Sequence, residues 1–447
     1  MDLWRLVFGW LARSTRAGGD LAAAREVCQR FRGLATPVTK QQVPISDCLN
    51  SASRTEWLLS HRPQEWWERT FGIKLLAKAA KVGSLEVVKL LRGRGHRWNA
   101  WTCENAAKDG HLEVLQWARA NGCPWDQWTC ASAAQNGHLN VLQWLRSQSP
   151  PCPWGEQTCT WAAANGHLKV LQWLRDETLH SLHGNGPCPW SEWACAHAAE
   201  NGHLKVLQWL RLEAKPPCPW NKWACVWAAE NGHLEVLQWL RDETLHSLHG
   251  NGPCPWSTEA CANAALNGHL EVLQWLRLKA NPPCPWDEWA CAEAAENGHL
   301  EVLQWLRDET IHALHGNAPC PWDEKTCANA ASNGHLEVLQ WLRDETLHAL
   351  QGNAPCPWNA FTCARAAENG HLKVLQWMRL EANPPCPWNE WICSVAAENG
   401  HLEVLQWLRS RALHGNAPCP WNRKECLDDA RVNGHQKVVK WLISQFD

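Results

Sequence analysis

Apolar positions recur with the period of a helix in the stretch Asn297–Arg307, which reads NGHLEVLQWLR. Leu300, Val302, Leu303 and Leu306 fall on one arc of a helix, while the glutamate and glutamine between them point the other way. The pattern predicts a helix from about residue 299 to residue 307 with one buried face. The same eleven letters begin at four other asparagines, Asn231, Asn267, Asn333 and Asn399.

A further helix is predicted directly before this one. Asp287 belongs to the residue types that cap a helix N-terminus, and its counterparts in the other copies are Asn, Asp, Ser or Gly. We therefore expect a first helix over residues 288–296. Asn297 and Gly298 end it, because both residue types accept the left-handed backbone that closes a helix. Each copy thus reads as two helices joined by a tight turn.

The helix pair recurs at intervals of 27 to 36 residues. A sustained period near 30 is typical of a solenoid, in which each unit buries its apolar face against its neighbours. Short copies stop at a PPCPW segment, because proline cannot continue a helix, whereas long copies are predicted to extend the second helix through DETLHSLHGN. The aligned glycines are Gly83, Gly110, Gly137, Gly166, Gly202, Gly232, Gly268, Gly298, Gly334, Gly370, Gly400 and Gly434.

The segment AAENGHLEVLQWLR resembles the ankyrin repeat, whose usual core reads TPLHxAAxxGHLEVVKLLL. The resemblance covers residues 71–447 as an array of about twelve repeats. It departs where TPLH becomes WACA or TCAN, with Cys291 at the leucine position, and where the connection is shortened to CPW. It implies an all-α, ankyrin-like helical-repeat solenoid with short loops in place of full β-hairpins. Residues 1–70 are an N-terminal segment that we interpret as a degenerate capping repeat.

Composition narrows the classes of function. The net charge is −3 and no domain-length segment is strongly basic, so nucleic acid is not the expected partner. The first residues lack the apolar core of a secretory signal and the roughly 20 apolar residues of a membrane span. The 23 cysteines are therefore expected as thiols in a reducing compartment, cytoplasmic or nuclear. The arginine-rich, acid-poor start leaves a mitochondrial alternative.

Cysteine and histidine recur in a pattern with metal-ligand types. Ten repeats carry C-P-W-x4-C, and in long repeats two histidines precede it, as in His180, His183, Cys188 and Cys195. This set would suit zinc. Short repeats keep both cysteines without the histidines, so we interpret the cysteines as buried thiols, with metal sites and disulfides as alternatives. No cofactor is expected.

Candidate catalytic chemistry is not found. His299 has a counterpart at the same helix start in nearly every copy, whereas a general base needs one tuned environment. We therefore expect it to make a backbone or inter-repeat hydrogen bond. No nucleophile elbow, phosphate-binding loop or dinucleotide glycine pattern lies in a suitable context. The tryptophans at the Trp305 position are expected to pack in the core.

Function is predicted from the positions at which the repeats differ. Two residues before and two residues after the helix cysteine, the copies mix Trp, His, Arg, Glu and Asn, the types that anchor protein interfaces. In an ankyrin-like stack this first helix lines the concave side. The candidate partner-binding residues are Trp128, Trp161, His197, Trp227, Asn263, Glu293, Lys325, Asn329 and Arg365.

The sequence thus favours a monomeric, non-catalytic scaffold that binds a protein partner, with no membrane segment. One alternative is a substrate-recognition adaptor, for example of a ubiquitin ligase, that recruits through residues 1–70. Another is a zinc- or redox-responsive Cys/His repeat protein. Drift at tolerant surface positions would also produce the variable rows, and a single chain does not separate that from selection for binding.

Overall fold

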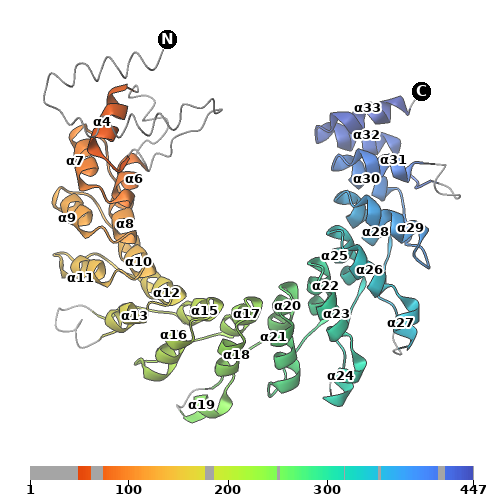
Figure 1. Ribbon diagram of the computed structural model, residues 1–447, viewed down its shortest axis with the longest axis horizontal. Helices are drawn as coiled ribbons and strands as arrows, with labels where there is room; N and C mark the ends of the chain where they lie inside the picture. The colour runs from red at the N-terminus through yellow and green to blue at the C-terminus, as the bar shows by residue number, and fades with distance from the viewer. Residues whose placement is uncertain are drawn as a thin grey trace, which may run out of the picture. The chain divides into compact units, whose positions relative to one another are not determined.

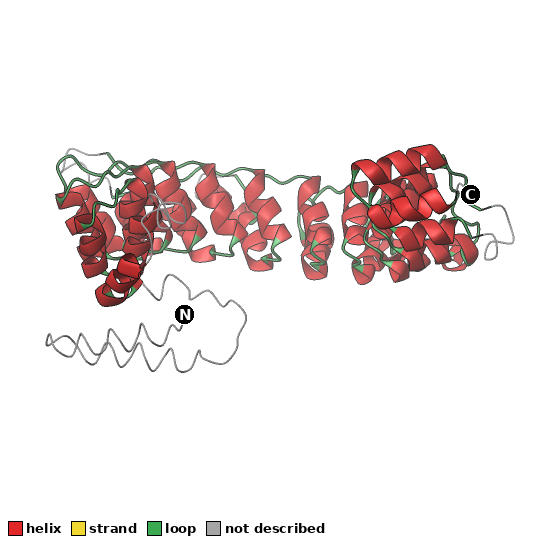
Figure 2. Cartoon of the chain, turned by 90° about the horizontal axis from the view of Figure 1, so that it is seen from above, coloured by secondary structure: helices red, strands yellow, loops and turns green. Residues whose placement is uncertain are grey.

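Helices and loops make up the whole described part of the chain (Figure 2). The computed structural model describes residues 49–61, 74–176, 186–248, 252–316, 318–350, 354–410 and 418–445. The expected all-α class is confirmed, and within these ranges short loops stand where full β-hairpins would lie. The chain divides into two compact units, Met1–Ala162 with Lys169–Pro189 and Ala163–Leu168 with Trp190–Asp447.

Each repeat contributes a first helix, here called helix A, and a second, called helix B. Up to the boundary of the two units the helices are α4 (Ala52–His61), α6 (Lys74–Val82), α7 (Leu85–Gly93), α8 (Ala100–Lys108), α9 (Leu112–Ala120), α10 (Gln127–Gln135), α11 (Leu139–Ser147), α12 (Glu156–Ala164) and α13 (Leu168–Leu174). Helices A are α6, α8, α10 and α12, and helices B are α7, α9, α11 and α13.

The second unit repeats the same order. Its helices A are α15 (Glu192–Glu200), α17 (Lys222–Glu230), α20 (Thr258–Leu266), α22 (Glu288–Glu296), α25 (Glu324–Ser332), α28 (Ala360–Glu368), α30 (Trp391–Glu398) and α32 (Arg423–Val432). Its helices B are α16 (Leu204–Gln208) continued by the π-helix η1 (Trp209–Glu213), α18 (Leu234–Leu240), α21 (Leu270–Gln274) continued by η2 (Trp275–Lys279), α23 (Leu300–Leu306), α26 (Leu336–Leu342), α29 (Leu372–Leu380), α31 (Leu402–Leu408) and α33 (Gln436–Ser444). Within the described ranges, short third helices follow three of these: α19 (Glu243–Leu248), α24 (Glu309–Leu314) and α27 (Glu345–Leu350).

Helix A begins and ends where its capping residues predict. In α22, the side chain of Asp287 accepts a hydrogen bond from the backbone N–H of Trp289, and the helix spans the predicted residues 288–296. Gly298 adopts the left-handed φ of 75° and turns the chain into helix B. Asn297 keeps a negative φ, so the glycine alone supplies the left-handed residue.

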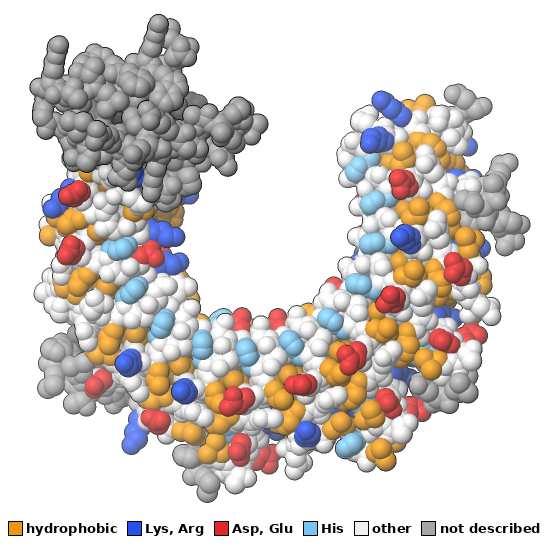
Figure 3. Space-filling view, viewed as in Figure 1, with side chains coloured by type: hydrophobic (Ala, Val, Ile, Leu, Met, Phe, Trp, Pro, Cys, Tyr) orange, Lys and Arg blue, Asp and Glu red, His pale blue; other side chains and the backbone are white. Residues whose placement is uncertain are grey.

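The histidine at the start of helix B ties each repeat to the one before it. Nε2 of His299 donates to the carbonyl of Leu266 at 3.0 Å, and its ring lies against Gly268, where an added Cβ would come within 2.7 Å. Glycine is therefore required there both for its φ and for this close approach. The expected inter-repeat hydrogen bond is confirmed, and Figure 3 shows these histidines in a row along the second unit.

Neighbouring helices A pack more extensively against one another than neighbouring helices B do. A stack of repeats curves toward the side on which neighbouring helices lie closer together. In the second unit the helices A accordingly line the inner side and the helices B the outer side (Figure 1). This arrangement fits the concave helix-A surface that the ankyrin resemblance implied.

Cysteine thiols link the loops of successive repeats. The Sγ–H of Cys291 in α22 donates to the carbonyl of Cys320, and the Sγ–H of Cys320 donates back to the carbonyl of Asp287. The described cysteines from Cys103 to Cys426 are buried and free. Burial raises the pKa of Cys320, which keeps it a protonated hydrogen-bond donor. The C-P-W-x4-C pattern thus has a structural explanation as a pair of buried S–H donors.

An arginine and two tryptophans hold each CPW loop in place. In the loop before α22, Arg277 donates to the carbonyl of Cys284 and lies over the Trp286 ring, with 4.1 Å between its Cζ and the ring centroid. Trp286 packs edge-on against Trp305 of helix B at 6.1 Å. The WLR ending of helix B is therefore a packing motif, and Trp305, 7% exposed, lies in the core as expected.

The long repeats differ from the expected continuous helix. Helix α23 ends at Leu306, and Asp308 caps a separate helix, α24, by accepting from the N–H of Ile311. His312 of α24 is fully buried, donates from Nε2 to the carbonyl of Trp305 at 2.9 Å, and packs edge-on against two tryptophan rings. The prediction of one extended helix was therefore wrong, because the tryptophan cluster holds α24 back against the core.

Candidate functional site

Exposed aromatic rings occupy one position in the repeat. Each lies on helix A two residues before the buried cysteine. Among the described residues, every large aromatic side chain classed as exposed lies at this position, with exposed fractions of 38–46%: Trp101, Trp128, Trp193, Trp289, Phe361 and Trp391. Because exposed tryptophan is costly to leave in water, a row of such rings is typical of a contact surface. We call this position on helix A the front row, whichever residue a repeat carries there.

A second row lies on helix A two residues after the cysteine, and it is mostly half-buried. Its side chains reach toward the front row of the preceding repeat. Trp161 lies 5.4 Å from Trp128, and Trp227 stacks on Trp193 with 5.6 Å between ring centroids. Each ring pair therefore bridges two neighbouring helices A and adds about 0.5–1.5 kcal/mol beyond area burial. We call this the back row.

Most polar side chains in the back row are paired within the protein. The amide of Asn263 donates to Glu230 at 3.0 Å, and that of Asn329 donates to Glu296 at 3.1 Å, each across a repeat boundary. His197 and Arg365 instead contact Glu200 and Glu368, the acids three residues later on the same helix, at 2.6 and 2.7 Å. Glutamates at the end of helix A thus neutralise or hydrogen-bond most polar back-row residues.

Cations also cover the front-row rings. Nζ of Lys325 lies 4.4 Å from the ring centroid of Trp289, and Nζ of Lys222 lies 4.9 Å from that of Trp223. Lys222 also forms an ion pair with Glu259 at 2.6 Å, which lowers the pKa of this carboxyl together with the hydroxyl of Ser257. The surface therefore combines aromatic faces with fixed charges.

The structure places all nine sequence-predicted binding residues on helices A. It pairs Trp128 with Trp161 and His197 with Trp227, whereas Arg365 bonds to Glu368 on its own helix. The prediction concentrated on the back row and left out five exposed front-row rings: Trp101, Trp193, Trp289, Phe361 and Trp391. Their shared position, two residues before the cysteine, was the available signal.

The zinc candidates do not come together as a ligand set in the described residues. Cys188 donates its S–H to the carbonyl of Gly155, and Cys195 donates to that of Cys218. His180 and His183 lie outside the described residues. Where the structure describes the chain, no group of three or more His, Cys, Asp or Glu side chains could hold a metal ion. The buried histidines of other long repeats, such as His312, face tryptophans.

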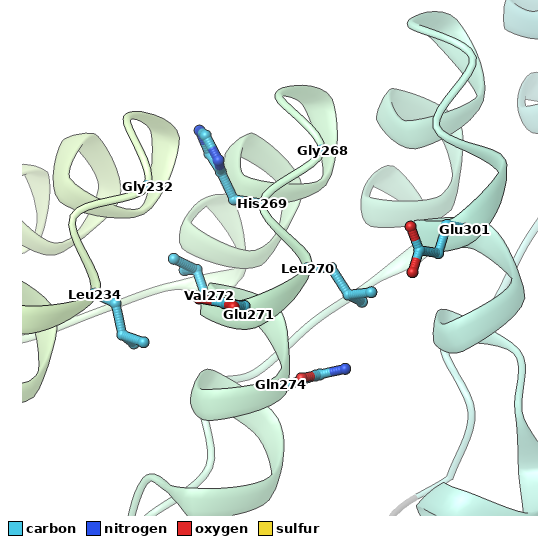
Figure 4. Close-up of a pocket in the computed structure, with 9 residues that line it drawn as sticks. All are labelled: Gly232, Leu234, Gly268, His269, Leu270, Glu271, Val272, Gln274 and Glu301. Atoms are coloured by element: carbon cyan, nitrogen blue, oxygen red, sulfur yellow. The ribbon is translucent and has the colours of Figure 1, made fainter.

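Two surface cavities lie in the second unit. The larger, about 520 Å³, lies among the first turns of α18, α21 and α23 (Figure 4). Its labelled side chains, such as His269 and Glu301, come from successive helices B and do not point toward a common centre. The smaller, about 230 Å³, lies between α20 and α22 on the helix-A surface and is lined by Glu259, Asn263, Trp289 and Glu293. Of these two cavities, only the smaller one is lined by both carboxylates and a tryptophan ring.

Paired helices stacked through buried loops define the chain as a helical-repeat protein. The family model described as ankyrin repeats (many copies) matches residues 103–146 and 225–277. The two matched segments support the resemblance to ankyrin repeats that the GHLEV segments indicated. No curated protein matches the chain.

Solved structures of other repeat proteins show a distant likeness. A crystal structure of the pentatricopeptide repeat protein PPR10 in complex with an 18-nt psaJ RNA element is 12% identical, with a TM-score of 0.35, covering 100% of this chain and 72% of that one. A cysteine-to-serine variant of the same protein in the same complex gives equal values. At this TM-score the likeness carries no conclusion about fold or ligand. No described helix is long and apolar enough to cross a membrane.

Proposed function

We propose that the chain is a non-catalytic scaffold that binds a protein partner through the helix-A surface. The front row of exposed aromatic rings is the observation that carries this proposal. Six such rings share one repeat position on helix A, and tryptophans are among the commonest energetic anchors of protein interfaces. Rings scattered by drift would be found on both helices.

Rigid support favours binding further. The front-row rings lie on short helices whose ends are capped and whose cysteines are fully buried, so they lose little conformational freedom when a partner binds. Trp193, for example, is held against Trp227 and His197. A binding surface on fixed helices needs no ordering step before contact.

Charge favours a protein over a nucleic acid. Helices α20 and α22 carry Glu259, Glu288, Glu293 and Glu296 and neither lysine nor arginine. Phosphate groups would be repelled there, since nucleic-acid binding draws most of its affinity from basic side chains. The whole chain also has a net charge of −3.

The adaptor alternative remains a prediction about residues 1–70, of which the structure describes 49–61. In that segment α4 packs against α7, and Glu56 forms an ion pair with Arg94 at 3.0 Å. These contacts fit the interpretation of α4 as part of a capping repeat. A recruiting role would need a second partner bound there.

Affinity capture with matched variants tests the proposal. The wild-type chain, Trp193→Ala and Leu380→Ala are immobilised, and captured proteins are quantified by mass spectrometry. Leu380 is the control because it is a 51%-exposed apolar residue on helix B. We expect at least one protein that Trp193→Ala depletes about tenfold or more while Leu380→Ala does not. Equal depletion by both variants, or by neither, would refute the helix-A surface as the binding site.

A further inference from the structure

The step from α20 to α22 differs from the two steps of the helix-A surface at which aromatic rings pair. At the steps α10 to α12 and α15 to α17, a front-row ring meets a back-row ring of the next repeat. At the step α20 to α22, both of these positions are carboxylates, Glu259 in front and Glu293 behind. Two acids therefore line the same space that two aromatic rings fill elsewhere.

Glu293 differs from the other polar back-row residues because the described residues offer it no hydrogen bond or ion pair. Its counterparts Asn263 and Asn329 bind the terminal glutamate of the preceding helix A, but here that position is Leu266. Glu296, the acid three residues later, is already bonded to Asn329. Burial, followed by the charge of Glu296, raises the pKa of Glu293. A half-buried carboxylate without a cation is an unfavourable arrangement that a bound cation would relieve.

The space between the two carboxylates is open. The cavity of about 230 Å³ is bounded by Glu259 and Asn263 of α20 and by Trp289 and Glu293 of α22. It is smaller than the roughly 300–1,000 Å³ of typical small-molecule sites, and so suits a single side chain better than a metabolite. Glu259 stays ionised there through its ion pair with Lys222.

The tryptophan that borders the cavity and the negative charge of its two glutamates together indicate which kind of partner side chain fits there. Lys325 lies over the Trp289 ring from the following repeat, so the ring already supports a cation, while the same tryptophan also borders the cavity toward α20. The protein stacks arginine on tryptophan elsewhere, as Arg277 does on Trp286 at 4.1 Å. A guanidinium is planar and can stack on a ring while donating to a carboxylate, whereas an ammonium cannot do both equally well.

We propose that the cavity between α20 and α22 receives an arginine side chain of the protein partner. The guanidinium donates to Glu293 and lies along Trp289, and Glu259 adds negative potential from the opposite wall. This inference rests on the proposed function, because it names the residue type that the helix-A surface recognises at this step.

The test uses the full chain and two labelled peptides, hexa-arginine and its neutral analogue hexa-citrulline, with affinity measured by fluorescence anisotropy. The variants are Glu293→Gln, which removes the unpaired charge, and Glu293→Lys, which supplies a cation from within the chain. Glu271→Gln is the matched control, because Glu271 is an exposed acid on helix B and its replacement changes the net charge equally. Circular dichroism verifies that each variant is folded.

We expect hexa-arginine to bind about tenfold more weakly to Glu293→Gln, and more weakly still to Glu293→Lys, because a hydrogen bond between charged groups is lost. Glu271→Gln should bind within about twofold of wild type, because an exposed charge outside the cavity contributes little. Hexa-citrulline should bind weakly and respond to none of the substitutions. The inference is overturned if Glu293→Gln and Glu271→Gln weaken binding equally, or if Glu293→Gln has no effect.

The two proposals fail separately. If Trp193→Ala loses partner capture while Glu293→Gln binds hexa-arginine as wild type does, the arginine site is overturned and the proposal that helix A is the binding surface stands. Weakened hexa-arginine binding in Glu293→Gln with unchanged partner capture in Trp193→Ala supports the cavity and refutes the wider surface.

Discussion

Replacement of Leu303 by alanine should destabilise the array more than any single change on its surface. Leu303 lies in α23, is 0% exposed, and belongs to the face that packs helix B onto helix A. Leu303→Ala removes buried methyl groups and leaves a cavity that the surrounding helices fill only in part. We therefore expect a loss of about 3–5 kcal/mol in the free energy of unfolding.

Hydrogen exchange measured by mass spectrometry is the suitable assay, because a long repeat array need not unfold in a single two-state transition. Protection should fall most in α22 and α23 and in the repeats that flank them, and remain unchanged in α8 and α9. Leu300→Ala is the matched control, since Leu300 is the same residue type on the same helix but only half-buried. If Leu300→Ala lowers protection as much as Leu303→Ala, the assignment of the buried face is wrong.

Four further predictions follow from the same contacts. Arg277→Ala should cost about 2–4 kcal/mol, measured by urea unfolding, because it removes a charged hydrogen bond and a cation–π contact; a change below about 0.5 kcal/mol would contradict the loop-clamping role. Most thiols should resist Ellman's reagent in the native chain and react fully in urea, since burial shields them from the reagent; rapid native reaction with most of them would contradict the packing. Glu293→Gln should raise the free energy of unfolding at neutral pH, because the raised native pKa of Glu293 means that its ionised form destabilises the folded state. This gain in stability should shrink as the pH falls through the raised pKa toward 4.5, the ordinary pKa of a glutamate. A gain that persists in acid would exclude ionisation as its cause. Trp161→Ala and Arg365→Glu should retain the wild-type fold in thermal melts but weaken partner capture, and melts as damaged as that of Leu303→Ala would refute the surface assignment.

Features set by neighbouring residues could be predicted from the sequence. The bounds of α22 follow from the cap at Asp287 and the left-handed turn at Gly298, both of which act within a few residues. The burial of Leu303 follows from helical periodicity, and the hydrogen bond of His299 follows from its repetition at one place in nearly every repeat. Local propensity and repetition were therefore sufficient for the helix pair that each repeat contributes.

Features set by contacts between repeats could not be predicted in the same way. Asp308 caps α24 and was a local signal for the break after α23, but the contacts of His312 with the tryptophan carbonyl and rings, which hold α24 against the core, depend on packing. Front-row and back-row residues lie on the same short helix four positions apart, and only the packing of the next helix A decides which is covered. For the same reason, the unpaired state of Glu293 depends on the residue one repeat earlier, Leu266.

Site-specific photo-crosslinking tests the central claim, that helix A is the face on which a protein partner binds, most directly. Benzoylphenylalanine is introduced at the position of Trp193 on α15 and, in a second chain, at that of Leu380 on α29, both exposed in the free protein. The account predicts that the protein captured by the wild-type chain crosslinks from the first position and not from the second. Crosslinking from the helix-B position alone would contradict it.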